Sequence, residues 1–181
     1  MIQHKIKYLV STVIAMSTFL FFIISCEKDD VCIDTPITPQ VQIVFDDFES
    51  ITTGDTIRKR VVGLLVEQIT PNSLSDKILL NSASTDSISL PLNVNEDRVS
   101  YKFTENFGAE DSSIIRENIL EFIYDRNNIY VNRACGFKTD FKITDLNDDT
   151  DAADDTKWIN SIRINNRIIN NEEKRHITIF H

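Results

Sequence analysis

The acidic run in the C-terminal quarter of the chain holds the densest group of oxygen ligands. Asp145, Asn147 and Asp149 have the alternating spacing that opens a calcium-binding loop. The sixth position of that loop is Thr150 instead of glycine, and the twelfth is Thr156 instead of glutamate. We therefore predict a solvated acidic loop, with the first three residues as weak calcium candidates. We expect no other metal and no cofactor.

Catalysis by a nucleophile has little support in the sequence. A hydrolase serine needs glycines on both sides at a sharp turn, and none of the four glycines provides this arrangement. We expect His176 and His181 to be exposed on the face of the last strand rather than to act as a catalytic base. Carboxylates are too numerous to single out a pair, so a carboxylate-based hydrolase of the cell envelope is the alternative to a protein without catalysis.

Aromatic side chains offer a third kind of chemistry, because flat rings can form a platform for a glycan. The candidates are Tyr101, Tyr124, Tyr130 and Trp158. We expect most of them to lie in the core or to form cross-strand pairs. A calcium- or glycan-binding β module is therefore the second alternative.

The N-terminal residues form an export signal. His4, Lys5 and Lys7 precede an uncharged apolar stretch of about 17 residues, which is the pattern of an exported protein. The stretch ends in Ile23-Ile24-Ser25-Cys26, which resembles a bacterial lipobox. Cleavage before Cys26 would leave its sulfur to carry the lipid, with palmitate-type acyl chains that hold the protein on the membrane. An uncleaved transmembrane anchor is the alternative, because the stretch is near the minimum length for a membrane span.

Charged residues follow the cysteine directly. Lys28, Asp29 and Asp30 resemble the tag, a lysine followed by two acids, that sends lipoproteins to the outer face of the outer membrane. A solvated linker has a similar composition. We therefore predict an outer membrane lipoprotein, with a preference for the cell surface over the periplasm.

Two further cysteines remain, Cys32 and Cys135. In an oxidising compartment we expect them to form a disulfide bond, with two separate buried thiols as the alternative. Only five residues separate Cys26 from Cys32, which span about 20 Å at most. The bond would hold the domain close to the membrane.

The charge of the chain excludes some partners. Loss of residues 1–25 removes two of the 19 basic residues and none of the 28 acidic ones, which leaves a net charge of −11. This charge repels nucleic acid, and no basic stripe counteracts it. We expect partners to be the membrane, reached through the lipid on Cys26, and an envelope protein or glycan.

The elements that must position these residues are short strands. Apolar residues alternate along most of them, and Val62, Leu64 and Val66 are predicted to share one face. Residues 125–128 supply a tight hairpin between two strands, and one helical turn is expected near 111–118, although the apolar spacing of 114–122 also fits a helix. The predicted strands are 41–45, 60–69, 87–92, 98–104, 119–124, 129–133, 137–143, 158–164 and 175–180.

This pattern predicts an all-β fold, an antiparallel sandwich or barrel of about eight or nine short strands after the lipoprotein signal peptide. The domains are expected to be a signal peptide over 1–25, a lipidated tether over 26–36 and one β-rich domain over 37–181.

Several segments spread along the mature chain carry a family resemblance. They are Cys26-Glu27-Lys28-Asp29-Asp30 with Cys32, Thr85-Asp86-Ser87-Ile88-Ser89-Leu90-Pro91-Leu92, Asn132-Arg133-Ala134-Cys135-Gly136-Phe137, Trp158-Ile159 and His176-Ile177-Thr178-Ile179-Phe180-His181. In these segments the chain resembles an uncharacterised family of lipoproteins from Bacteroidetes-type bacteria, known only as a domain of unknown function. The resemblance implies a membrane-anchored β domain that keeps both later cysteines, and it implies no activity or ligand. Together, these observations favour an extracytoplasmic binding or assembly module without catalysis.

Overall fold

The computed structural model describes residues 16, 38–54, 56–70, 77–148 and 157–181. The chain divides into two units, one of residues 36–130 with 137–181 and one of residues 1–35 with 131–136. The first of these contains the β domain. Of the second, the structure describes Met16 and the turn 131–136.

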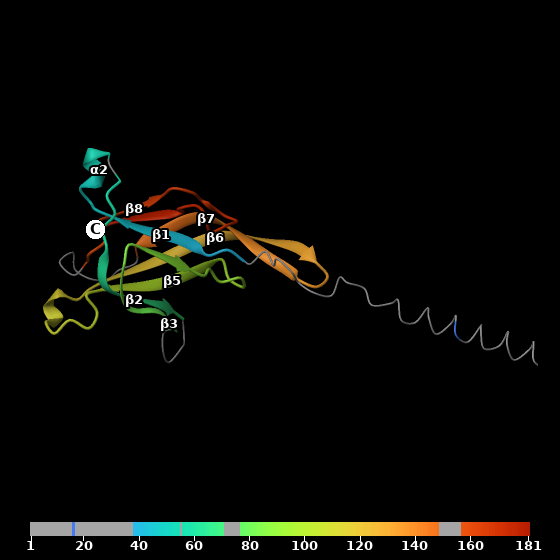
Figure 1. Ribbon diagram of the computed structural model, residues 1–181, viewed down its shortest axis with the longest axis horizontal. Coiled ribbons are helices and arrows are strands. Elements are labelled where there is room, and N and C mark those ends of the chain that lie inside the picture. Colours follow the sequence, from blue (N-terminus) through green and yellow to red (C-terminus); the bar gives the residue numbers. More distant parts are fainter. Residues whose placement is uncertain (1–15, 17–37, 55, 71–76, 149–156) are drawn as a thin grey trace, which may run out of the picture. The chain divides into compact units, whose positions relative to one another are not determined.

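The β domain consists of strands, with two short helical segments between them (Figure 1). The all-β class predicted from the sequence is confirmed. The elements in chain order are β1 (Val41–Asp46), α2 (Ser50–Thr53), β2 (Val61–Ile69), β3 (Lys77–Thr85), β4 (Ser87–Leu90), β5 (Arg98–Glu105), the 3-10 helix η2 (Ser112–Ile114), β6 (Arg116–Asn132), β7 (Gly136–Asp148), β8 (Ser161–Ile164), β9 (Ile168–Ile169) and β10 (Ile177–Phe180).

The strands form two sheets. The four-stranded sheet has the order β4-β1-β10-β8, and the six-stranded sheet has the order β3-β2-β5-β6-β7-β9. The strand β1 pairs with β10 in parallel, and Ile43 lies opposite Ile177. The pairings of β1 with β4, β10 with β8, β2 with β3 and β5, β5 with β6 and β7 with β9 are antiparallel. The first and last strands of the domain therefore lie side by side in the centre of the smaller sheet.

One core lies between the sheets, which makes the fold a sandwich. Alternate residues of each strand face it, because successive side chains of a strand point to opposite sides. The cluster joins both sheets and includes Val41, Ile43, Phe45, Ile177 and Ile179 from the smaller one and Leu64, Val66, Tyr101, Phe103, Leu120 and Phe122 from the larger one.

The hairpin predicted at residues 125–128 is wrong. These residues lie inside β6, which is one strand of 17 residues. Two side chains of the predicted turn form hydrogen bonds with neighbouring segments. Arg126 Nε donates to Asp97 Oδ1 at 2.7 Å, and Asn128 Oδ1 accepts from Thr139 Oγ1 at 2.8 Å. Because the neighbouring segments satisfy these groups, the strand continues. The chain reverses instead before Gly136, whose φ is +71°.

The predicted faces of β2 also need a correction. Val62 is 58% exposed, whereas Val61, Leu64 and Val66 are fully buried. The register of β2 against β3 shifts between Val61 and Leu64, because Gly63 has a φ of +57° and forms a bulge. The extra residue turns Val62 outward.

Three further differences concern number and type. The strands β3 and β9 were not predicted, so the described domain has ten strands rather than eight or nine. Residues 115–122 are not helical, since the 3-10 helix η2 ends at Ile114 and β6 begins at Arg116. None of the helices in the described ranges is long and apolar enough to cross a membrane.

Candidate functional site

Most of the residues assigned to the membrane anchor lie outside the described residues. Cys26, the tag residues Lys28, Asp29 and Asp30, and Cys32 all belong to this group. Lipidation, surface export and the Cys32–Cys135 pairing therefore stay predictions.

Cys135 lies in the turn between β6 and β7. Its backbone N–H donates to Asn132 Oδ1 at 2.7 Å, which helps to close the turn. The turn joins the two longest strands of the domain, so Cys135 lies at the tip of a long hairpin.

The structure describes only two of the three calcium candidates. Asp145 and Asn147 lie in β7, and Asp149 lies outside the described ranges. In an extended strand Asp145 and Asn147 share one face. Among the described residues there is no group of three or more His, Cys, Asp and Glu side chains that could hold a metal. A calcium loop completed by Asp149 stays a prediction.

Asn118 fixes both ends of the segment that contains the acidic run. It is fully buried in β6, and its Oδ1 accepts hydrogen bonds from the backbone N–H groups of Trp158 and Ile159 at 3.1 and 3.2 Å. Its Nδ2 donates to Asp148 Oδ2 at 3.2 Å. One amide therefore ties the end of β7 to the chain that leads into β8.

His176 and His181 are both buried, which corrects the expectation that they are exposed. His176 is 0% exposed, and its Nδ1 accepts a hydrogen bond from the backbone N–H of Gln42 at 2.9 Å. The Nε2 atom therefore carries the proton of the neutral ring, and it has no hydrogen-bond partner among the described residues. Burial lowers the pKa of His176 below its usual value. The parallel pairing of β10 with β1, which the sequence did not indicate, encloses this side chain.

His181 lies in a second buried polar group. Its Nδ1 is 3.9 Å from Glu105 Oε1, and its Nε2 is 3.4 Å from the carbonyl oxygen of Lys59. Burial lowers the pKa of His181 and raises the pKa of Glu105, because the interior disfavours the charged form of each group. The ring packs edge-on against Phe45 and Trp158. These contacts place His181 in the interior and explain its shifted pKa by packing.

Three of the four aromatic candidates for a platform are also buried. Tyr101, Tyr124 and Trp158 are at most 4% exposed. The Tyr124 hydroxyl accepts from the backbone N–H of Asn93 at 2.8 Å, and burial raises the pKa of Tyr124 to about 12. Tyr101 donates its hydroxyl to the carbonyl of Pro91. These rings serve the core, as expected for most of them.

Tyr130 differs from the other three. It is 57% exposed on β6 and makes an edge-on contact with Phe137 of β7, with 5.3 Å between the ring centres. Phe137 is 70% exposed. The sequence pattern predicts Phe137 at the start of an alternating strand. It does not indicate that this part of the strand lies beyond the core, where Phe137 is exposed.

A hollow of about 390 Å³ lies on the six-stranded sheet. Its lining includes Glu96, Arg98 and Glu121, and Arg98 NH1 contacts Glu121 Oε1 at 3.1 Å. Neither histidine lines it. The hollow thus brings two carboxylates together, one of which is already paired with a cation.

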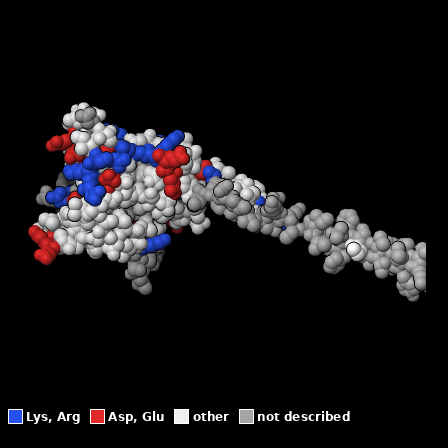
Figure 2. Space-filling model, in the orientation of Figure 1, with Lys and Arg blue, Asp and Glu red and all other residues white. Residues whose placement is uncertain are grey.

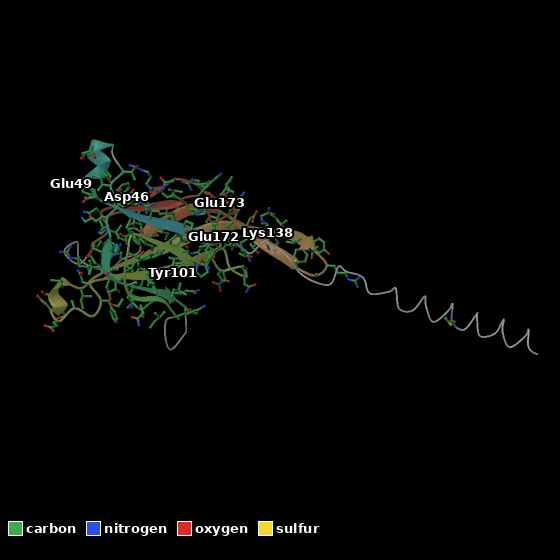
Figure 3. The ribbon with its side chains drawn as sticks, in the orientation of Figure 1. Asp46, Glu49, Tyr101, Lys138, Glu172 and Glu173 are labelled. Carbon is green, nitrogen blue, oxygen red and sulfur yellow. The ribbon has the colours of Figure 1, made fainter. Side chains whose placement is uncertain are left out.

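Two arginines pair with one buried carboxylate on the four-stranded sheet, and a third lies over the ring of Phe180. Asp46 ends β1 next to α2 and is 2% exposed (Figure 3). Its Oδ2 is 3.1 Å from Arg175 NH1, and its Oδ1 is 3.6 Å from Arg58 Nε. In the register of β1 with β10, Asp46 lies opposite Phe180, and the guanidinium of Arg163 lies 4.8 Å from the centre of the Phe180 ring.

We call Arg58 and Arg175, which pair with Asp46, together with Arg163, which lies over Phe180, the arginine cluster. It carries three positive charges against one negative charge, although the chain as a whole is strongly acidic. Figure 2 shows Lys and Arg side chains gathered where β1 and β8 lie in Figure 1, with acidic side chains among them. The sequence contained one signal for it, the basic triplet Arg58-Lys59-Arg60, but the other two arginines are more than 100 residues away along the chain.

Residues 63–181 match the family described as DUF6452, a family of unknown function. The match covers 119 of the 181 residues. The chain belongs to the DUF6452 family. The DUF6452 match begins inside β2, so it includes Arg163 and Arg175 and leaves out Asp46 and Arg58. No curated protein and no solved structure matches the chain.

Proposed function

We propose that this protein is a membrane-anchored, extracytoplasmic lipoprotein whose β-sandwich binds an anionic envelope partner without catalysis. The anchor rests on the sequence before Cys26: a basic head, an apolar stretch and a lipobox-like ending. Lys28, Asp29 and Asp30 favour the outer membrane, with the surface-facing side preferred. The Cys32–Cys135 bond belongs to the same proposal, because disulfides persist in oxidising compartments.

The arginine cluster is the observation that supports binding. Guanidinium groups present several donors in one plane, which suits carboxylate and phosphate groups. The side chains of Arg58 and Arg175 are 42% and 32% exposed, so donors not directed at Asp46 can reach solvent. Asp46 holds two of the arginines in position and leaves the cluster with excess positive charge.

The anchor is tested by intact mass spectrometry of the protein isolated from its own membranes. We expect a chain that begins at Cys26 and carries acyl chains. An unmodified thiol at Cys26, or a retained Met1, would remove the anchor from the proposal. Digestion of intact cells with protease then reports the side: loss of the domain supports the cell surface, and survival supports the periplasm.

Binding is tested by crosslinking in whole cells followed by quantitative mass spectrometry of the purified protein. The variant Arg58→Gln/Arg175→Gln is compared with wild type and with Arg98→Gln, which removes an arginine that is 66% exposed on the other sheet. We expect the double variant to lose an anionic partner several-fold and the control to retain it. Equal recovery from all three proteins would contradict the role of the arginine cluster.

The carboxylate-based hydrolase remains a second candidate because Glu96 and Glu121 share the hollow of about 390 Å³. Paired carboxylates can act as acid and base on a substrate bound between them. A panel of envelope glycans and esters would test it, with Glu96→Gln as the inactive variant. Hydrolysis that wild type performs and this variant loses would favour the enzyme over the binding module.

A further inference from the structure

The hairpin of β6 and β7 continues past the part of the domain that is packed on both sides. The pairing of β6 with β5 ends at Ile123, yet β6 extends to Asn132. Tyr124 is the last buried residue of β6, and Thr139 is the first buried residue of β7. The segments 125–132 and 136–138 therefore form a part of the hairpin that adds nothing to the core (Figure 1).

Two exposed aromatic rings lie on this outer part. Tyr130 and Phe137 are 57% and 70% exposed and contact each other edge-on. Phe137 is the second-most exposed large apolar residue among those described, after Met16. A long two-stranded hairpin usually places such rings against a core or carries polar residues in their place. Here the rings stay uncovered by the described chain.

The charge of the same segment differs from the rest of the protein. Residues 127–139 contain Arg133 and Lys138 and no acidic residue, although the chain has 28 acids. Lys138 (Figure 3) forms an ion pair with Asp140 at 3.0 Å. Arg133 is exposed. Aromatic rings together with Lys and Arg, without acids, match the composition found where proteins meet the headgroup layer of a membrane.

The start of the domain is held beside this hairpin. Thr139 N donates to Thr38 Oγ1 at 3.1 Å, and Thr139 lies two residues after Phe137 in β7. The first described residue of the domain, Thr38, is therefore close to the exposed rings. Cys26 lies 12 residues before Thr38, which is at most about 40 Å of extended chain. A Cys32–Cys135 bond would bring Cys26 within five intervening residues of the turn of the hairpin. With that bond, a lipid on Cys26 would be confined to the neighbourhood of the exposed rings.

We infer that the outer end of the β6–β7 hairpin is a second membrane contact, in which Tyr130 and Phe137 enter the headgroup layer of the bilayer that holds the lipid of Cys26. This inference rests on the anchor of the proposed function. It orients the domain, because the lipid alone leaves the chain free to rotate about its tether. The arginine cluster lies on the other sheet and is left for a partner.

The test places a tryptophan at the hairpin and measures its depth. The variant Phe137→Trp, made in the full acylated chain, is reconstituted in phosphatidylethanolamine/phosphatidylglycerol vesicles whose acyl chains carry bromine, a quencher of tryptophan emission. Wild type, with only Trp158, supplies the background, since that ring is 4% exposed in the core. The matched control is Ile78→Trp, because Ile78 is 54% exposed on the distant edge strand β3.

We expect several-fold greater quenching, and a blue shift on reconstitution, for Phe137→Trp than for Ile78→Trp. Replacement of Tyr130 by serine in the Phe137→Trp protein should reduce the quenching. Equal quenching of the two tryptophans in an acylated chain would overturn the hairpin contact and leave the anchor intact. An intact mass without acyl chains would overturn the anchor, and the hairpin inference would fall with it.

Discussion

His176 links the start of β10 to β1 through a hydrogen bond, which the sequence did not predict. It is neutral inside the protein, with Nδ1 bonded to the backbone of Gln42 and the rest of the ring enclosed. A proton added to Nδ1 would break this bond and place a charge in a site that cannot hydrate it. The imidazole therefore joins β10 to β1 and makes that junction sensitive to acid.

Stability should consequently fall as the pH is lowered through the range below about 6.5. The pKa of His176 is lower in the folded protein than its ordinary value of 6.5, so the unfolded chain binds more protons there. Each proton contributes a slope of up to about 1.4 kcal/mol per pH unit. We expect His176→Asn, whose amide oxygen can still accept from Gln42, to flatten this dependence in urea titrations at pH 5 and 7.

His181 contributes in the same direction, because burial also lowers its pKa. The variant His176→Asn/His181→Asn should therefore show a smaller slope than either single variant. A slope as steep in the double variant as in wild type would show that other groups control the response to acid.

Gly63 is the other residue at which one atom decides the local structure. Its φ is +57°, and an added Cβ would lie 3.1 Å from the carbonyl oxygen and 3.2 Å from the nitrogen of Phe107. Those backbone groups are fixed, since Phe107 N donates to Gly63 O at 2.9 Å. A side chain at this position would strain the backbone and also collide with it.

We expect Gly63→Ala to lower the free energy of unfolding by at least about 2 kcal/mol. Gly54→Ala is the matched control, because Gly54 also has a positive φ but no atom within 4 Å of the added Cβ. It should cost only about 1 kcal/mol. Urea denaturation followed by far-ultraviolet circular dichroism measures both values, and equal losses would remove the contact with Phe107 as the cause.

Among the described elements, β6 is the longest strand, with 17 residues. It pairs with β5 through residues Arg116–Ile123, supplies buried residues at alternate positions and then continues into the exposed hairpin. Asn118 adds a contact between layers, since it bonds the chain that leads from Trp158 into β8. A single strand thus connects the six-stranded sheet to the four-stranded one.

Replacement of Asn118 by alanine should lower the free energy of unfolding by about 2–4 kcal/mol, because two buried backbone N–H groups lose their acceptor. The comparison is Asn128→Ala. Asn128 lies on the exposed part of the same strand, and its replacement removes a hydrogen bond from Thr139 of β7. That change should cost less than about 1 kcal/mol. Thermal denaturation of both variants gives the comparison, and a similar loss from both would contradict the bridging role of Asn118.

At the scale of the whole molecule, the termini of the domain are held at opposite features. The described part of the domain begins at Thr38, beside the long hairpin, and ends at His181 beside α2, where Phe48 N donates to the His181 carbonyl. An anchor before Thr38 and a second contact through Tyr130 and Phe137 would act on the same end of the sandwich. The arginine cluster lies near Asp46, close to the other terminus.

The proposed Cys32–Cys135 bond closes a loop of about 100 residues, which contributes about 4–5 kcal/mol when the entropy of the unfolded chain dominates. We expect Cys32→Ser and Cys135→Ser to lower stability by similar amounts and the double variant to lower it no further. Tryptic mapping without reductant should give one crosslinked peptide pair. Losses that add in the double variant would instead indicate two separate buried thiols.

Sequence periodicity was sufficient for much of the sandwich, because alternation reports which face of a strand meets the core. Val99, Tyr101 and Phe103 were predicted to share a face, and all three are at most 6% exposed. The same rule failed at Val62, where one positive φ reverses the alternation, and at residues 125–128, where bonds to other segments keep the strand extended. Local patterns hold no information about such partners.

What the sequence determined by itself is therefore the chemistry of its own short segments: the export signal as a prediction, the all-β class, and the residues that face inward on most strands. The burial of His176 and His181, the pairing of Arg58 and Arg175 with Asp46, and the exposure of Phe137 were decided only by the tertiary structure. Each depends on strands far apart in the chain, such as β1 against β10, and pairing over that distance is set by how the whole core packs.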